Sequence, residues 1–470
     1  MSATSRTFQS LKDGNPITGK EIADLITEAK PRHIEQLSLY ERYKGSKTGV
    51  PIFTRTYPIA DTSKVNNKIA NDFFSDIVDT KTGYMAGQPI TYEYDDESVS
   101  ETIRGFIKRN SIPDLDSESI KMAAIAGYSA RYCYIDTDGE IGIINVPPWE
   151  CIFICDELGI TDAEYAIRYY PIEINGEKYT KAEFMDEAGI SYWIRKEDVY
   201  NKDGESFILD PTETPNPLPH LLGGCPLICF PNNEELQGDC EKALSLIDGY
   251  DRTLSDINSE IEQFRLAYLA LYGINASDET LKLMRQTGAI SIPDTAAKAE
   301  FITKNLNDVI VENHLNRLES NIYMFTKSVK ISDEQFAANA SGVAMKYKLF
   351  GLESKCITTE RKFTKALYRM FEVLAGYFDK RGVSFDPWEF SFVWVRNFPL
   401  DLMAEAQATV QLKGMVSEET RLSQLTFVNN VEEEMAKMKQ DTEDMIDLDK
   451  IMFPQQDQQN PDQMMATSSS

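Results

Sequence analysis

Four short segments carry residue types that could do chemistry, and the first has the spacing of a phosphate-binding loop. Gly14-Asn-Pro-Ile-Thr-Gly19-Lys20 fits the first seven positions of that motif. The next position should be Ser or Thr, whose hydroxyl binds magnesium, and a strand should precede the loop. Here it is Glu21, whose carboxylate would repel phosphates, and no strand-like pattern precedes Gly14. A turn that begins a helix is the favoured interpretation, and nucleotide binding is the alternative.

Two cysteine pairs could hold a zinc ion. Cys151 and Cys155 form one C-x3-C pair, and Cys225 and Cys229 form another. Both pairs lie in strand-like apolar sequence, where four residues span about 13 Å. Two thiolates that far apart cannot share one ion at Zn–S distances of about 2.3 Å. We therefore favour buried free thiols, and we predict neither a metal site nor another cofactor.

The fourth segment, Asp136-Thr-Asp138-Gly139-Glu140, begins like a calcium-binding loop. It lacks the rest of the ligand pattern, and Asp-Gly between alternating strands is typical of a hairpin turn. The three histidines, His33, His220 and His314, are far apart in the sequence, and none lies in an H-E-x-x-H motif. We predict no catalytic residues, although folding could still bring a His, a Cys and an Asp together.

The length and charge of the chain limit its function class. At about 150 residues per domain, 470 residues suggest about three domains. The 75 acidic and 48 basic residues give a formal net charge of −27, which argues against tight binding of nucleic acid, because such binding needs Lys and Arg against the phosphates. This charge is compatible with a protein that lies close to DNA without being held by it.

The chain carries no sign of export or membrane insertion. Its polar N-terminus has no secretory signal, and no stretch has the roughly 18 apolar residues of a membrane span. The seven cysteines fit free thiols in a reducing cytosol. We expect a soluble protein of cytoplasmic origin with no membrane partner.

The first half of the chain predicts a mixture of helices and strands. A helix is expected over residues 19–30, ended by Pro31, as the only helix of the first 60 residues. Another helix, ended by Gly87, is predicted by the apolar residues Ile69, Phe73, Phe74, Ile77, Val78, Tyr84 and Met85. After a short helix from residue 119, strands are expected at residues 132–135, 141–146, 165–170 and 192–194, with another at 90–94 and an exposed loop at 211–219.

Beyond residue 232 the pattern becomes strongly helical. Steps of three and four predict one long helix through Ile247, Tyr250, Leu254, Ile257, Ile261, Phe264, Tyr268 and Leu271. The same rhythm predicts a second helix through Val311, Leu315, Leu318, Ile322, Phe325 and Val329. Between them we expect a compact insert at 273–304 with a strand at 289–292. A third helix is expected at 342–380, a strand at 388–394, short helices at 402–413 and 431–449, and a disordered tail.

The third helix is unusually basic for an acidic chain. Its cations, with two just before it, are Lys327, Lys330, Lys346, Lys348, Lys355, Arg361, Lys362, Lys365 and Arg369. A solvated or intersubunit salt-bridged face is the favoured interpretation, because charged helix faces are usually that. A cationic surface near a polyanion is the alternative.

Three stretches carry a resemblance to a known family. They are Asn66-Asn67-Lys68 with Phe73-Phe74, Ile77 to Lys81, Tyr84, Gly87 and Pro89-Ile90; Cys225 to Ile228 with Phe230 to Glu235 and Ile247 to Asp251; and Gly414 to Thr420 with Phe427-Val428 and Val431 to Glu434. In this order they resemble the portal proteins of tailed bacteriophages, of the siphophage type, over residues 54–449.

The resemblance implies an α+β fold with a mixed α/β wing domain, a long-helix stem, a small α/β clip and a helical C-terminal crown. On this chain it implies an N-terminal arm (1–53), wing (54–238), first stem helix (239–272), clip (273–304), second stem helix (305–331), tunnel loop (332–342), long wing helix and strand (343–400), crown (401–453) and disordered tail (454–470). The tunnel loop departs from the family pattern because Gly342 is its only glycine, and the tail lacks a long acidic run.

The resemblance also implies site residues. Those expected to face a DNA tunnel are Gln335, Phe336, Asn339, Ser341, Lys346 and Lys348. Those expected to pack the stem are Ile247, Tyr250, Leu254, Ile257, Ile261, Phe264, Leu315, Leu318, Ile322 and Phe325. Those expected in the clip are Ile290, Ile292, Pro293 and Phe301.

The family implies a homo-oligomeric ring, usually a dodecamer, at one capsid vertex of the virion, assembled in the host bacterial cytoplasm. Its expected partners are double-stranded DNA passing through the tunnel, the terminase large subunit, head–tail connector proteins, scaffold and the major capsid protein. It is not expected to be an enzyme. Two alternatives stay open: an acidic metal-dependent hydrolase, and another ring or scaffold component of a virus head.

Overall fold

The computed structural model describes residues 2–56, 65–156, 159–197, 206–264, 268–272, 282, 298–302, 308–330, 342–397, 407, 409–423, 425, 428, 431 and 434–440. The chain divides into two compact units, Met1–Asn397 and Phe398–Ser470. The larger unit combines helices with antiparallel sheets, so the predicted α+β fold class is confirmed.

The described chain begins with the helices α1 (Ala3–Lys12), α2 (Gly19–Tyr43) and α3 (Pro51–Thr54). The motif at Gly14–Lys20 is the start of α2, where Thr18 and Glu21 form a reciprocal capping box. The prediction of a single helix ended by Pro31 is wrong, because Pro31 lies inside α2. Pro31 is exposed, and buried residues such as Leu25 and Leu39 on either side of it keep one continuous face against the core.

Three further helices follow, and the last of them packs against a small sheet. They are α4 (Phe73–Ala86), α5 (Glu97–Arg109) and α6 (Ile112–Ala126). The sheet has the order β10-β2-β3, formed by β2 (Tyr128–Ile135), β3 (Ile141–Val146) and β10 (Leu227–Pro231). The predicted hairpin between residues 132 and 146 is confirmed, with Gly139 at a φ of 78° in its turn.

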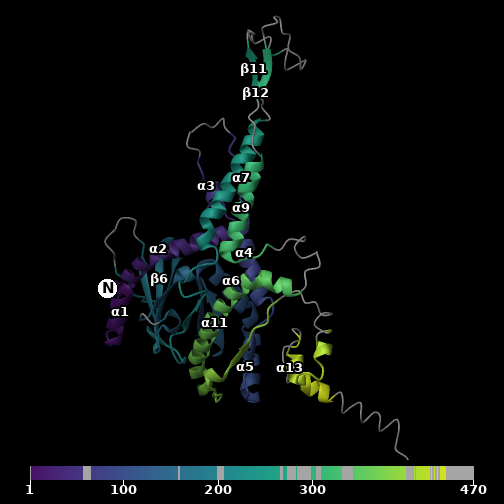
Figure 1. Cartoon of the computed structure of the whole chain (residues 1–470). Coiled ribbons are helices and arrows are strands. Elements are labelled where there is room, and N and C mark those ends of the chain that lie inside the picture. The colour runs from purple at the N-terminus through teal and green to yellow at the C-terminus, as the bar shows by residue number, and fades with distance from the viewer. Residues whose placement is uncertain are drawn as a thin grey trace, which may run out of the picture. The chain divides into compact units, whose positions relative to one another are not determined.

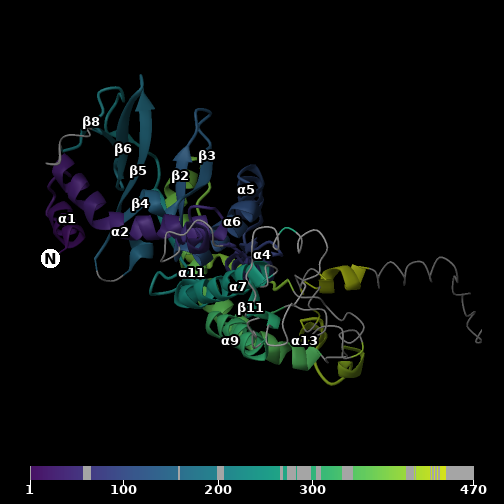
Figure 2. The same ribbon diagram turned by 90° about the horizontal axis from the view of Figure 1, so that it is seen from above.

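A larger antiparallel sheet has the order β4-β5-β6-β7-β8, with β9 also paired to β7. Its strands are β4 (Cys151–Ile154), β5 (Tyr165–Ile174), β6 (Glu177–Met185), β7 (Gly189–Lys196), β8 (Ile208–Leu209) and β9 (Leu218–Pro219). α1 and α2 pack on one face of it, where their apolar residues join a core that includes Ile154, Ile167 and Phe184 (Figures 1 and 2). Short 3-10 turns stand at Pro148–Glu150, Ile160–Asp162, Glu241–Ala243 and Pro387–Glu389.

All seven cysteines are free thiols, and six of them are buried. Cys151 begins β4 and Cys229 lies in β10, as the strand prediction required, while Cys155 is only half-buried. Burial raises the pKa of Cys225 to about 12, so that thiol stays protonated near neutral pH.

The two predicted long helices are α7 (Leu244–Phe264) and α9 (Asp308–Thr326). The prediction that the first helix continues through Tyr268 and Leu271 is wrong. Those residues form β11 (Tyr268–Tyr272), which pairs antiparallel with β12 (Lys298–Ile302). We call α7, β11, β12 and α9 the hairpin, and Figure 1 shows α7 and α9 side by side within it. The strand expected at 289–292 lies outside the described residues.

The third predicted helix is α11 (Gly342–Lys380), with the expected bounds. It packs against β10 and α4. The strand predicted at 388–394 is shorter: after a 3-10 turn, β13 (Ser391–Val393) pairs with β1 (Thr91–Glu93), which confirms the strand expected near Tyr92.

The C-terminal unit is described in part. Residues 409–412 and 434–440 are helical, within the two helices predicted at 402–413 and 431–449. A further helix, α13 (Glu418–Leu422), was not predicted, although Ser417 caps it by accepting a hydrogen bond from the Thr420 N–H. The tail expected at 454–470 lies outside the described residues.

Candidate functional site

The predicted packing residues of the hairpin differ in how far they are buried. Ile247, Leu315 and Ile322 are buried, and Ile247 and Ile322 join the core formed with α4 and α6. Further along the hairpin, four residues are half-buried: Tyr250, Leu254, Ile257 and Leu318. Ile261, near the end of α7, and Phe325, near the end of α9, are each more than half exposed. The side chain of Phe264 lies outside the described residues.

Other large apolar side chains on these helices face solvent in the single chain. Val309 on α9 is 68% exposed, and Tyr347 near the start of α11 is 79% exposed. Met324 on α9 and Phe350 on α11 are also exposed. Contiguous apolar surface on a soluble protein marks an interaction site more often than chance. The hairpin and the start of α11 therefore carry large apolar side chains that another macromolecule could cover.

An extended segment, residues 65–72, lies along α7, and we call it the strap. Three of its backbone N–H groups, spaced two residues apart, donate to side chains spaced four apart on α7: Asn71 to Asp251 Oδ1 at 2.9 Å, Ile69 to Ser255 Oγ at 2.9 Å, and Asn67 to Ser259 Oγ at 2.8 Å. All three acceptor residues are buried. One face of α7 is thus occupied by its own chain, and polar rather than apolar groups fill that contact.

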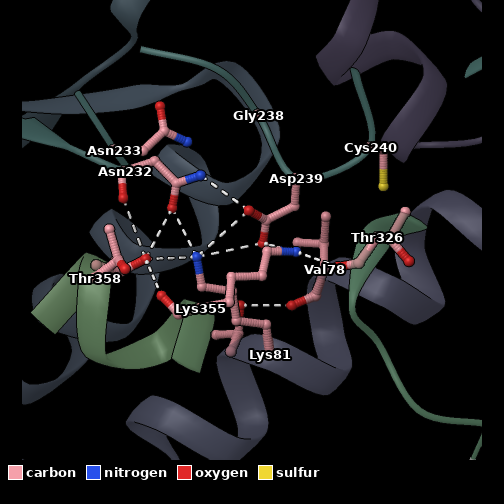
Figure 3. Close-up of polar contacts among 12 residues, drawn as sticks. Val78, Lys81, Asn232, Asn233, Gly238, Asp239, Cys240, Thr326, Lys355 and Thr358 are labelled. Atoms are coloured by element: carbon pink, nitrogen blue, oxygen red, sulfur yellow. Dashed lines mark hydrogen bonds and ion pairs between the residues drawn. The ribbon is translucent and has the colours of Figure 1, made fainter. Parts of the chain in front are cut away.

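A buried ionic cluster lies at the base of the hairpin, and Figure 3 shows its polar contacts. It consists of Lys81 on α4, Asn232 and Asp239 in the segment between β10 and α7, and Lys355 and Thr359 on α11. Lys81 Nζ donates to Asn232 Oδ1 at 2.7 Å and to Thr359 Oγ1 at 2.8 Å, and it lies 3.3 Å from Asp239 Oδ2. Lys355 Nζ lies 3.1 Å from the same Oδ2 atom. Two ammonium groups therefore share one carboxylate.

The charges of this cluster shift each other's protonation. Burial lowers the pKa of Lys81, and the attraction of Asp239 offsets only part of this effect. Burial alone would raise the pKa of Asp239, but the charges of Lys81 and Lys355 and the hydrogen bond from Asn232 together outweigh it, so the net shift is downward. Asp239 is therefore a firmly ionised carboxylate at neutral pH.

Sequence reasoning missed the cluster, although one signal was present. Lys81 lies on the same face of α4 as Phe74, Ile77, Val78 and Met85, all of which are buried. A lysine within an apolar stripe requires a buried partner, because an unpaired buried charge is costly. The identity of that partner could not be predicted, because Asp239 and Lys355 come from distant segments.

Most cations of the basic helix contact acidic groups of the same chain. Five pairs are described: Lys330 with Glu319, Lys355 with Asp239, Lys362 with Glu234, Lys365 with Asp162, and Arg369 with Glu372. These contacts support the interpretation of a salt-bridged face, with partners inside the chain rather than between subunits. Arg361 is exposed.

The described residues contain no metal-binding cluster that would support the hydrolase alternative. Among them, no three His, Cys, Asp or Glu side chains come together in a way that could hold a metal ion. Nor, within the same residues, is any helix long and apolar enough to cross a membrane.

The comparison with known protein families identifies the family of the chain. The family described as "Phage portal protein, SPP1 Gp6-like" matches residues 22–447. The chain belongs to this family. It is similar to the portal protein of Bacillus phage SPP1, with 26% identity over 457 residues, or 90% of this chain and 88% of that protein. It is also similar to the portal protein of Clostridium phage phiCD119, with 24% identity over 395 residues, or 78% and 83% of the two chains.

The portal family is structural rather than catalytic, and its members are components of the phage virion. The resemblance to portal proteins is therefore confirmed over nearly the whole chain. The chain that carries the exposed apolar side chains and the buried ionic cluster is therefore one component of a larger assembly.

The structure places few of the residues predicted to touch DNA or partners. Lys348 is exposed on α11, and Phe301 lies in β12 opposite Leu269. The following predicted tunnel and clip residues, or their side chains, lie outside the described residues: Gln335, Phe336, Asn339, Ser341, Lys346, Ile290, Ile292 and Pro293. Their roles stay predictions.

Proposed function

We propose that this portal chain assembles into a ring, usually a dodecamer in this family, at one vertex of the capsid. Double-stranded DNA is packaged and ejected through the ring. The observation that carries the proposal is the exposed apolar surface on the hairpin and on the start of α11. Copies packed side by side around an axis would cover that surface, and closed rings are built from such heterologous contacts.

The charge of the chain supports a conduit rather than a DNA-binding protein. The net charge is −27, and five of the nine cations in and just before α11 contact acidic groups within the chain. Few unpaired cations would therefore be available to neutralise phosphates and hold DNA in transit.

The hairpin would supply the stem of this ring. In the proposed division, residues 54–238 form the wing, α7 and α9 the stem, residues 332–342 the tunnel loop and residues 401–453 the crown. The pairing of β11 with β12 supports starting the clip at Tyr268 rather than at residue 273. The clip would dock the terminase large subunit, and later the head–tail connector proteins. Scaffold and the major capsid protein would surround the ring, which would be assembled in the host cytoplasm.

Electron microscopy of the purified protein tests this function. We expect rings with a central opening, and a single copy at micromolar concentration would contradict the proposal. Phe325→Asp should abolish the rings, because it places a charge on the proposed contact surface. Ile208→Asp is the matched control, since Ile208 is similarly exposed but lies on β8, far from the hairpin in the fold. Rings that form but never admit DNA in a packaging reaction would favour a different virus-head ring component.

A further inference from the structure

The buried ionic cluster holds one more cation than a neutral pair needs. By formal charge, Asp239 contributes one negative charge, whereas Lys81 and Lys355 contribute two positive ones. The side chains of Lys81 and Asp239 are 0% and 2% exposed, and that of Lys355 is 16% exposed. Desolvating a second ammonium group is costly, so its presence calls for a separate reason.

The reason lies at the C-terminal end of α9. There the Ser328 N–H donates to the Tyr323 carbonyl at 3.1 Å and the Lys327 N–H to the Met324 carbonyl at 3.3 Å, with Lys327 at a φ of 54°. This is the Schellman pattern of helix ends. This pattern supplies donors for the carbonyl groups of Tyr323 and Met324, whereas the carbonyl group of Thr326 needs another donor.

Lys355 is that donor. Its Nζ donates to the Thr326 carbonyl oxygen at 2.9 Å, across 29 residues of sequence. A helix C-terminus carries a partial negative charge, which an ammonium group there stabilises. The second cation of the cluster is thus balanced by the end of α9 rather than by a second carboxylate.

Asp239 is itself held in place from several directions. Its Oδ1 accepts from Asn232 Nδ2 at 2.9 Å, and its backbone N–H donates to the Ala124 carbonyl on α6 at 2.7 Å. Thr359, one helical turn after Lys355, donates to the Asn232 carbonyl at 3.2 Å. A carboxylate fixed in this way can aim the flexible Lys355 side chain at a single acceptor.

We propose that Lys355 is a positioning residue that joins the end of the stem helix α9 to α11. Asp239 holds the ammonium group of Lys355, and this group fixes the C-terminal end of α9 relative to α11. The assignment of α9 to a stem rests on the proposed function. The joint itself rests only on the contacts of Lys355, Asp239 and Thr326.

The charge count separates this role from a general contribution to stability. Removing Lys355 leaves the neutral pair of Lys81 and Asp239, so the fold should survive. Removing the charge of Asp239 leaves two buried ammonium groups with no carboxylate, so the fold should be strongly destabilised.

The first experiment compares Lys355→Met with Lys365→Met by hydrogen exchange of the full-length protein. Lys365 lies on the same helix and also forms an ion pair, but on the exposed surface. In Lys355→Met we expect the amides of residues 327 and 328 to exchange about tenfold faster, as for the loss of one charge-assisted hydrogen bond, while α4 and α6 stay as protected as before. Lys365→Met should change neither region. Unchanged exchange at 327 and 328 in Lys355→Met would overturn the proposal.

A second experiment tests the sharing of one carboxylate. Asp239→Asn should lower the denaturation midpoint strongly, and adding Lys355→Met to it should raise the midpoint again, because one of the two unpaired cations is removed. A double variant less stable than Asp239→Asn would overturn the shared pairing.

In assembled particles, Lys355→Met should form rings in normal yield but package less DNA than Lys365→Met does. Normal packaging by Lys355→Met would mean that the joint does not serve DNA passage. If the wild-type chain forms no rings, the proposed function fails, whereas the exchange experiment still decides whether the joint exists.

Discussion

The six-stranded sheet and the hairpin stabilise their structures in different ways. The sheet buries Ile154, Ile167 and Phe184 beneath α1 and α2, within one chain. The hairpin leaves large apolar residues such as Val309 and Phe325 exposed, and it fills the buried face of α7 with polar contacts to the strap. The sheet thus has an apolar core within one chain, whereas in the proposed ring the exposed side chains of the hairpin would be covered by neighbouring copies. Three predictions test this contrast.

The largest effect is expected from truncation in the sheet core. Phe184→Ala should lower the free energy of unfolding by about 3–5 kcal/mol, because it leaves a cavity among packed side chains. Phe325→Ala should change it by less than about 0.5 kcal/mol at protein concentrations too low for assembly, because its ring is already exposed. Urea denaturation followed by tryptophan fluorescence measures both. Equal losses would show that the hairpin, too, is packed within one chain.

A smaller effect is expected from acid. His33 stacks on Tyr169, with its Nδ1 atom 2.6 Å from the hydroxyl, and burial lowers the pKa of His33 to about 4 from its ordinary value near 6.5. The folded state therefore favours neutral imidazole, and its stabilising effect is complete above pH 6.5 and is lost as the pH falls toward 4. The loss amounts to about 3 kcal/mol.

Thermal melts between pH 7 and 4 measure this dependence. His33→Gln should have a flatter pH profile than the wild type. His314→Gln, at an exposed position on α9, should keep the wild-type slope. Identical slopes for all three proteins would contradict the role of His33 in joining α2 to the sheet.

The smallest effect is expected at the strap. Ser255→Ala removes the acceptor of the Ile69 N–H and the donor to the Ile69 carbonyl at 3.2 Å, and it should cost about 1–2 kcal/mol. Hydrogen exchange should become faster over residues 65–72. Ser245→Ala, at an exposed position on the same helix, is the control. Unchanged exchange would mean that the strap is held by other contacts.

The sequence predicted the elements whose patterns are local. The bounds of α11 and the β2–β3 hairpin follow from apolar periodicity and from an Asp-Gly turn, and both are confirmed. The capping box of α2 has the same kind of local signature.

Elements that depend on distant contacts were predicted less well. Tyr268 and Leu271 continue the heptad spacing of α7, but pairing with β12 makes that segment a strand. The exposed Pro31 is tolerated because the α2 face on the sheet is continuous around it. β6 was missed because its charged residues conceal the alternation that cross-strand pairing with β5 and β7 satisfies. The buried ionic cluster joins residues up to 278 positions apart, which no local pattern can predict.

The strap and α7 form a ladder between two unlike periodicities. Two residues of extended chain advance about 6.6 Å, whereas four residues of a helix advance about 6.0 Å and rotate about 40° beyond one full turn. The two repeats therefore match only over a short length, and the strap must curl around the helix to stay in register with it. A one-residue insertion in either partner would move every later rung out of register. We therefore expect insertions and deletions within the strap to be poorly tolerated.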